Sequence, residues 1–287
     1  MKRGRKIMQW VIGVLVVIIL GIVIWFSIPW SPMKAEFAGL KSGQNAPLSS
    51  TGEVFTKEDI AGLPAPLQRY FEVCGYLGKP KMFNIKMTHS DVNFILSSSM
   101  PTLKIKSTQY NSADKPERVA LLETRLYGIP FEGIDAYEGG EGSMKGVIAK
   151  AKVLFDQRGA AMNQSSLVNC LAESLFVPSI VLRDFMSWEA IDKSRVKGTI
   201  SYYGMSVSGM FTFDENGYFT DFTTEDRVYV DTAGNERQVS WSALCGDYRD
   251  VGGIMQPKSL KAVWHLPEGD LVYFDGHNTV IEYDVTG

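Results

Sequence analysis

The sequence is poor in the residues that build metal and thiol sites. Its 287 residues include 3 histidines and 3 cysteines, none of them in a His-x-x-x-His or Cys-x-x-Cys pair. Zinc sites usually draw their ligands from such closely spaced pairs, so we expect no metal site. Because Cys74, Cys170 and Cys245 are isolated and odd in number, at most one internal disulfide can form and none is required.

The motifs of common enzymes are absent or incomplete. No Gly-Lys-Ser/Thr follows the glycine-rich run at residues 139–142, so this run predicts a turn and not a phosphate-binding loop. Ser-x-x-Lys occurs at Ser31, Ser112 and Ser194 without the Ser-Asp-Asn and Lys-Thr-Gly partners of penicillin-recognising enzymes. We therefore assign no catalytic residue and expect no cofactor.

The chain also lacks a basic surplus beyond its first residues. It has 29 basic and 32 acidic residues, but Lys2, Arg3, Arg5 and Lys6 all precede the first acidic residue, Glu36. Without these four, 25 basic residues face 32 acidic ones, a balance of −7. A nucleic-acid-binding domain needs a basic face, so we expect no nucleic-acid partner.

One long apolar run predicts a membrane anchor. Residues 7–28 are apolar except for four positions, and about 22 residues at about 1.5 Å each cover the roughly 30 Å hydrocarbon core. A cleaved signal peptide has a shorter apolar run that ends in a small-x-small site, but this run ends in Ile28-Pro29-Trp30-Ser31-Pro32. The positive-inside rule predicts a cytoplasmic basic stub (1–6), a transmembrane helix (7–30) and export of the remainder. The expected location is thus the cell membrane, with a single span.

Two further segments are expected after the anchor. Residues 31–55 are rich in Gly, Ser, Asn and Pro, which predicts a flexible linker. Residues 56–287 form the extracytoplasmic, β-rich domain. It opens with a helix-start signal, Thr56-x-x-Asp59, and a short helix over residues 66–73 that ends before Gly75.

The body of this domain alternates apolar and polar residues with period two, as antiparallel strands do. The pattern covers residues 83–87, 147–155, 203–213, 260–266 and 281–285. Residues 165–185 instead show helical spacing that is broken by Pro178, which predicts two short helices. The expected fold is α+β: a large, curved, half-barrel-like antiparallel sheet whose concave face is covered by the helical insert.

Candidate functional residues follow from this architecture. Aromatic and apolar side chains on the strands are candidates for contact with a hydrophobic ligand: Trp188, Tyr203, Met205, Phe211, Phe213, Trp241 and Trp264. The polar candidates are Arg69, Asp135, Glu173, Glu189 and Asp192. Tryptophans such as Trp188, Trp241 and Trp264 are more often core residues than ligand contacts, and the carboxylates more often lie on a solvated helix face, pair with bases or cap a turn.

Several motifs, in order, resemble an uncharacterised bacterial family of unknown function. They are Leu63-Pro64-Ala65-Pro66 with Arg69-Tyr70, Gly133-x-Asp135-x-Tyr137, Ala172-Glu173 with Pro178, Trp188-Glu189-x-Ile191-Asp192, Phe213-Asp214-x-x-Gly217 and Trp264-x-x-x-x-Gly269. The resemblance spans residues 60–284 and implies no activity. The order of strands and helices is also similar to the half-barrels of bacterial lipoprotein carriers, an analogy of architecture only.

Three functions are compatible with these features. The leading hypothesis is that the domain binds a lipid or another hydrophobic ligand in a cavity of the curved sheet, which requires an apolar pocket of about 300 Å³ or more. An envelope hydrolase that uses Glu173, Glu189 and Asp192 would require these carboxylates to converge. A structural or sensory ectodomain would act through contacts with protein partners that the sequence does not identify.

Overall fold

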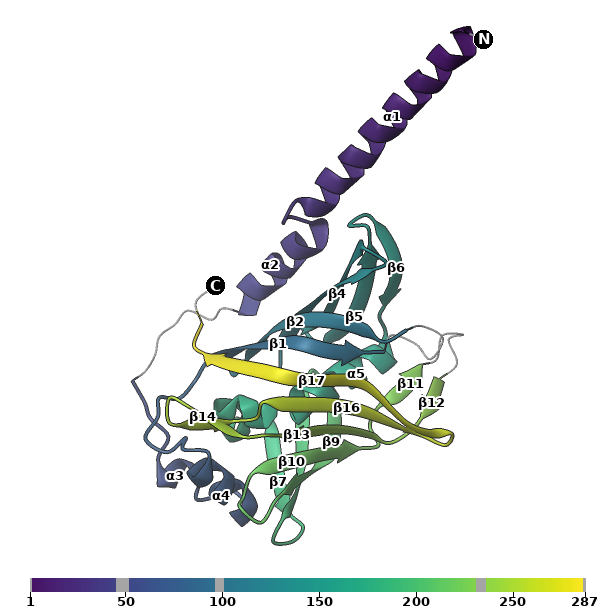
Figure 1. The fold of residues 1–287 in the computed structure, drawn as a ribbon. Helices are drawn as coiled ribbons and strands as arrows, with labels where there is room; N and C mark the ends of the chain where they lie inside the picture. The colour runs from purple at the N-terminus through teal and green to yellow at the C-terminus, as the bar shows by residue number, and fades with distance from the viewer. Residues whose placement is uncertain (1, 45–51, 96–100, 231–235, 286–287) are drawn as a thin grey trace.

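A single antiparallel sheet dominates the computed structural model, which describes residues 2–44, 52–95, 101–230 and 236–285 (Figure 1). Within these residues the sheet has 13 strands in the order β6-β5-β4-β3-β2-β1-β17-β16-β13-β10-β9-β8-β7. Neighbours along the chain pair within each half, and β1 pairs with β17 to join the halves. The sheet is open, because β6 and β7 remain as edges.

The first half is a meander of six strands. They are β1 (Asn84–Phe94), β2 (Leu103–Ser112), β3 (Arg118–Leu126), β4 (Ile129–Glu138), β5 (Glu141–Ile148) and β6 (Lys152–Gln157). The continuous strand predicted over residues 147–155 is wrong, since the chain reverses between β5 and β6. Ala149 and Lys150 have φ of 54° and 60°, and this left-handed turn leaves the alternation intact on both sides.

The second half forms the other side of the sheet. Its strands are β7 (Met186–Ala190), β8 (Arg195–Tyr202), β9 (Met205–Phe213), β10 (Phe219–Thr224), β13 (Trp241–Gly246), β16 (Ser259–Leu266) and β17 (Gly269–Tyr283). Two small hairpins stand apart from the sheet: β11 (Val228–Val230) with β12 (Glu236–Gln238), and β14 (Arg249–Val251) with β15 (Ile254–Gln256). The strands predicted over residues 203–213 and 260–266 correspond to β9 and β16, except that Tyr203 lies in the turn before β9.

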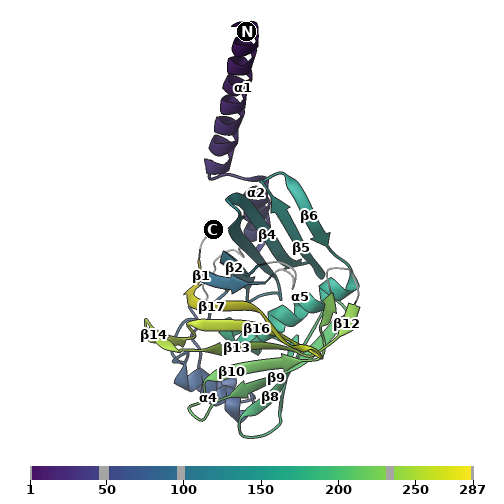
Figure 2. The ribbon, with the colours of Figure 1, turned by 45° about the vertical axis from the view of Figure 1, so that its right-hand side comes forward.

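A helical insert between the two halves covers the concave face. It comprises α5 (Ala160–Ala172) and the 3₁₀ helices η1 (Ser174–Phe176) and η2 (Pro178–Leu182). Helix α5 packs on β4 and β5 of one half and on β8 and β9 of the other, so it bridges the opening of the sheet (Figure 2). The predicted α+β fold is confirmed, although the helix predicted after Pro178 is the 3₁₀ helix η2, which begins at this proline, and η1 lies between it and α5.

Two short helices precede the sheet as predicted. At the start of α3 (Lys57–Ile60), the Thr56 hydroxyl accepts a hydrogen bond from the Asp59 amide at 3.2 Å. The Asp59 carboxylate accepts from the Thr56 amide at 2.8 Å, which completes a capping box. Helix α4 (Ala65–Val73) buries Leu67, Tyr70 and Phe71 in the main core. Gly75, with φ of 76°, follows its end.

The region predicted as a flexible linker contains a packed helix. Helix α2 (Pro32–Gln44) follows α1 (Lys2–Ser27), so the prediction is wrong for residues 32–44. Met33 and Phe37 are buried against Val119, Leu121 and other apolar residues on the convex face of the sheet. The glycine and serine content of the segment obscured this narrow apolar stripe. Residues 45–51 of the predicted linker lie outside the described residues.

Helix α1 is long and apolar enough to cross a membrane. Its most apolar 18-residue window has a mean hydropathy of 3.1, and none of that window is buried. The end of α1 contacts the sheet through Lys150, whose Nζ donates to the carbonyl oxygens of Trp25 at 3.0 Å and Ile28 at 2.5 Å. The Trp25 Nε1 donates in turn to the Ala149 carbonyl at 3.2 Å. The β5–β6 turn therefore satisfies carbonyl groups that the helix end leaves free.

Truncating Phe37 tests whether α2 belongs to the folded body. Phe37→Ala removes a buried ring, so we expect a loss of about 3 kcal/mol in the free energy of unfolding. We also expect faster hydrogen exchange over residues 32–44. The matched control is Tyr127→Ala, which removes a ring that is 89% exposed. Equal exchange rates in the wild type and Phe37→Ala would show that α2 does not depend on this contact.

Candidate functional site

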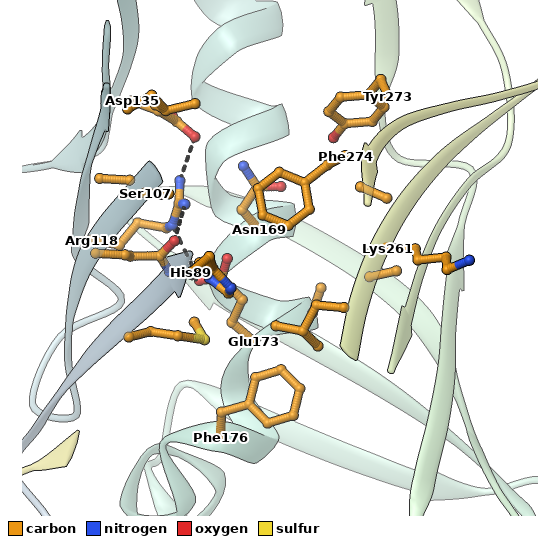
Figure 3. A pocket seen from close by; sticks show the side chains of 18 of the residues that line it. His89, Ser107, Arg118, Asp135, Asn169, Glu173, Phe176, Lys261, Tyr273 and Phe274 are labelled. Atoms are coloured by element: carbon orange, nitrogen blue, oxygen red, sulfur yellow. Dashed lines mark hydrogen bonds and ion pairs between the residues drawn. The ribbon is translucent and has the colours of Figure 1, made fainter. Parts of the chain in front are cut away.

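A cavity lies between the concave face of the sheet and the helical insert (Figure 3). Its volume is about 190 Å³, so the requirement of about 300 Å³ is not met and the cavity can hold only part of a lipid. Strands of both halves contribute to it, together with α5 and η1. The apolar part of the lining includes Met87, Phe94, Ala120, Leu122, Met144, Ala172, Phe176, Phe219, Trp241, Ala243, Leu260, Ala262 and Phe274.

One wall of the cavity carries a buried polar network. The Arg118 guanidinium, 4% exposed, donates from Nη1 to the Asp135 carboxylate at 2.8 Å and from Nε to the Glu173 carboxylate at 3.2 Å. Its Nη2 donates to the side-chain oxygen of Gln109 at 2.9 Å. The amides of Gln109 and Asn111 donate to the same Glu173 oxygen at 2.6 and 2.7 Å. The network ties β2, β3 and β4 to the end of α5.

The electrostatics of this network depend on Arg118. Burial alone would lower the pKa of Arg118, but the nearby carboxylates of Asp135 and Glu173 outweigh it and raise that pKa above its ordinary value. Glu173 is the C-cap of α5, where the helix dipole disfavours a negative charge. Arg118 and the two side-chain amides therefore compensate a carboxylate that its own helix does not stabilise.

His89 lies beside this network as a neutral group. Burial and, secondly, the charge of Arg118 lower the pKa of His89 to about 4. Its Nδ1 lies 3.0 Å from the Thr279 hydroxyl, and its ring meets that of Phe274 edge-on with centroids 5.3 Å apart. At neutral pH the imidazole thus adds no charge to the cavity.

The structure brings three of the predicted residues together in this cavity: Trp241, Asp135 and Glu173. The other predicted ligand contacts lie outside its lining. Phe211 and Phe213 are buried in the core, Trp188 packs on Phe211, and Trp264 stacks on Tyr273. Tyr203 and Met205 lie at the β8–β9 turn, where the Tyr203 hydroxyl donates to Glu117 at 3.0 Å. Arg69 donates to the Glu215 carbonyl at 2.5 Å near a surface turn.

The carboxylates predicted for a hydrolase do not converge. Glu173 lies in the cavity beside Arg118, whereas Glu189 is exposed on β7. Asp192 accepts hydrogen bonds from the backbone amides of Ser194 and Arg195, at 2.9 and 2.8 Å, and so caps an exposed turn. A pair of carboxylates on either side of one substrate bond is therefore not formed by these residues.

A serine, a histidine and an aspartate lie in a row elsewhere on the sheet. The Ser242 hydroxyl is 2.9 Å from the His265 Nε2, and the His265 Nδ1 is 2.9 Å from Asp270. Ser242 is 4% exposed and sits within β13, whose backbone pairs with both β10 and β16. A nucleophilic serine needs access and free N–H groups for an oxyanion, and a regular inner strand provides neither. We interpret the row as cross-strand hydrogen bonding.

Asp135 and Glu173 of the polar network were among the predicted candidates, but Arg118, Gln109 and Asn111 were not, because single polar residues on strands form no recognisable sequence pattern. Ser107, Gln109 and Asn111 do alternate with Lys106, Thr108 and Tyr110, so polar side chains occupy both faces of β2. That pattern is unusual for an inner strand and could have indicated a polar site. Within the described residues, no group of three or more His, Cys, Asp or Glu side chains is arranged to hold a metal ion.

Fold and site together define an open, curved-sheet protein with an internal cavity and an N-terminal apolar helix. A model of a family of unknown function, DUF6544, matches residues 53–276. The chain therefore belongs to this family, which confirms the predicted membership in an uncharacterised family.

The sequence matches no curated protein. Among solved structures, the chain is similar to a LolA superfamily protein from Nitrosomonas europaea, with a TM-score of 0.40 and 8% identity over 78% of this chain and 94% of that one. It is also similar to a DUF1329 family protein from Desulfovibrio piger, with a TM-score of 0.34 and 13% identity over 81% and 95% of the two chains. Both are distant similarities in the path of the backbone.

Removing Arg118 should destabilise the site strongly. Arg118→Met leaves Asp135 and Glu173 without their shared cation, and breaking a buried ion pair from one side costs about 3–5 kcal/mol. We expect urea unfolding of the full chain in micelles, followed by near-UV circular dichroism, to show a loss of that order. Arg195→Met, which removes an exposed ion pair with Asp192, should cost far less. Similar losses in both variants would contradict the role of Arg118.

His89 should make stability fall with acidity. The unfolded chain binds a proton at His89 near pH 6.5 and the folded chain only near pH 4, so stability is complete above pH 6.5 and declines as the pH falls. Between pH 7 and pH 5 this contribution is about 2 kcal/mol. We expect His89→Gln to flatten the pH dependence of the unfolding free energy by that amount. Tyr127→Ala, at an exposed position, should keep the wild-type slope; identical slopes for all three proteins would refute the prediction.

Proposed function

We propose that the protein is anchored in the cell membrane by α1 and binds the apolar part of a lipid or another hydrophobic ligand in the cavity of its extracytoplasmic domain. The observation that carries this proposal is the cavity itself. It lies inside the curve of the sheet, and most of its lining is apolar.

An unfilled cavity of this kind would be costly. Protein interiors are close-packed, and a void costs about 24 cal/mol per Å³, so one of about 190 Å³ would cost up to about 5 kcal/mol. Water is a poor filler next to an apolar wall, because each buried water needs two to four polar partners. A ligand that supplies apolar contacts would remove this penalty.

The cavity volume limits what enters it. About 190 Å³ equals the liquid volume of about six water molecules, which accommodates a short acyl segment and not a whole phospholipid. Burying about six methylene groups at about 0.8 kcal/mol each would supply about 5 kcal/mol. The remainder of a longer segment would lie outside this volume.

The surface near the end of α1 supports the membrane assignment. Two hairpins contact that end: Lys150 and Ala149 in the β5–β6 turn, and Arg125, which donates to the Phe26 carbonyl at 3.4 Å. The same hairpins expose Tyr127, Ile129, Val153 and Leu154. Aromatic and apolar side chains beside a membrane-crossing helix are suited to the headgroup region of a bilayer. The cavity would then lie at a fixed distance from the membrane surface.

Native mass spectrometry of the full chain with its co-purifying molecules tests the proposal. Ala262→Phe places a ring in the cavity, so we expect the bound hydrophobic mass to fall severalfold relative to the wild type. Ala190→Phe makes the same substitution at an exposed position of β7, and it should leave the bound mass unchanged. Both variants keep α1, so lipids bound by the anchor alone contribute equally to both bound masses and cancel in the comparison. Equal amounts in the two folded variants would show that the cavity is not the binding site.

A further inference from the structure

A second arginine, Arg227, also lines the cavity, but its surroundings differ from those of Arg118. Its side chain is 9% exposed and is held between two tryptophan rings. The centre of its guanidinium is 4.3 Å from the ring centroid of Trp241 and 4.9 Å from that of Trp264. Such stacking fixes the plane of the guanidinium; its Nη1 donates to the Tyr273 hydroxyl, and its Nη2 has no hydrogen bond within the described residues.

Within the part of the chain that the structure describes, this buried cation has no ion-pair partner. Among the described residues, no carboxylate lies within 4 Å of the Arg227 guanidinium, and its buried Nε has no hydrogen-bond partner. Arg118, by contrast, is shared by two carboxylates, and Lys261 of the same lining is 3.5 Å from Asp275. Arginine stays protonated inside proteins, and a buried unpaired charge is expensive. A ligand that brings a negative charge would offset this cost.

Tyr273 adds a second donor at the same place. Its hydroxyl oxygen accepts from the Trp241 Nε1 at 3.1 Å and from the Arg227 Nη1 at 3.3 Å. Both bonds use the oxygen as an acceptor, so the hydroxyl proton remains free to donate. Tyr273 lines the cavity as well. Arg227 and Tyr273 thus offer a guanidinium edge and an O–H group, the donors that a carboxylate or a phosphate accepts.

We infer that the ligand is an amphiphile with an anionic head, a carboxylate or a phosphate, that pairs with Arg227 and Tyr273 while its apolar segment fills the cavity. This inference rests on the proposed function and names its ligand class. A cationic head is disfavoured by Arg227 and finds the carboxylates of Asp135 and Glu173 already occupied by Arg118. A small inorganic anion would leave the apolar lining unfilled.

The test uses the full chain in phosphatidylcholine nanodiscs, with ¹³C-labelled methionine methyl groups observed by NMR. Met87 and Met144 line the cavity and report binding, whereas Met186 is buried outside the lining. The probes are octanoate, octyl phosphate, octanol and inorganic phosphate. We expect octanoate and octyl phosphate to shift the Met87 and Met144 signals with a Kd at least about tenfold lower than that of octanol. Inorganic phosphate should shift neither.

Variants test which residues cause the preference for anionic amphiphiles over octanol. Arg227→Gln should bring the Kd values of octanoate and octanol to within about threefold, with octanol binding unchanged as proof of an intact cavity. Arg227→Lys keeps the charge and should retain part of the preference if Arg227→Gln does not fold. Tyr273→Phe should weaken only the anionic probes. Arg195→Gln removes an exposed charge outside the cavity and should leave the preference unaltered.

The possible outcomes distinguish a failure of the anionic ligand from a failure of the proposed function. Equal binding of octanol and octanoate by the wild type would overturn the anionic ligand and leave the proposed function standing. Shifts with inorganic phosphate alone would replace the amphiphile with a free anion and overturn the inference. The absence of shifts with every amphiphile would remove the proposed function and this inference together. A preference that survives in Arg227→Gln would show that Arg227 is not its source.

Discussion

The fold depends on one constraint: a sheet of 13 strands that curves without closing must have its concave face covered. Helix α5 meets this constraint by packing on β4 and β5 from one half and on β8 and β9 from the other. The position of its end is held by the Arg118 pair with Glu173, which joins the helix to the centre of the first half. The cavity is what remains where the helix and the sheet do not fill the space between them.

Of the two arginines in the cavity, one stabilises the fold and the other is available to a ligand. Arg118 is fully compensated by Asp135, Glu173 and side-chain amides, so its charge serves the fold. Arg227 is stacked between rings but has no carboxylate among the described residues, so its charge is left for a ligand. The same residue type therefore has different roles, and the difference lies in the neighbours and not in the degree of burial.

Much of the fold could be predicted, because it is encoded in short-range patterns. Period-two alternation predicts the strands, and Thr56 with Asp59 predicts the start of α3. The site was harder, because β1 pairs with β17 and brings His89 beside Thr279, 190 residues later in the sequence. Arg118 and Arg227 carry no local pattern that separates them from surface arginines. Helix α2 was missed for a related reason, since its stripe of two buried residues depends on a sheet face formed by β3 and β4.

The contact between Lys150 and the end of α1 bears on how a bound molecule would travel. A soluble carrier crosses an aqueous compartment with its cargo. With α1 in a bilayer and the β5–β6 turn fastened to its last carbonyl groups, this domain could neither diffuse away from the surface nor swing freely above it. Its cavity would serve as a fixed binding site, from which a hydrophobic molecule passes between the adjacent leaflet and a partner on the aqueous side.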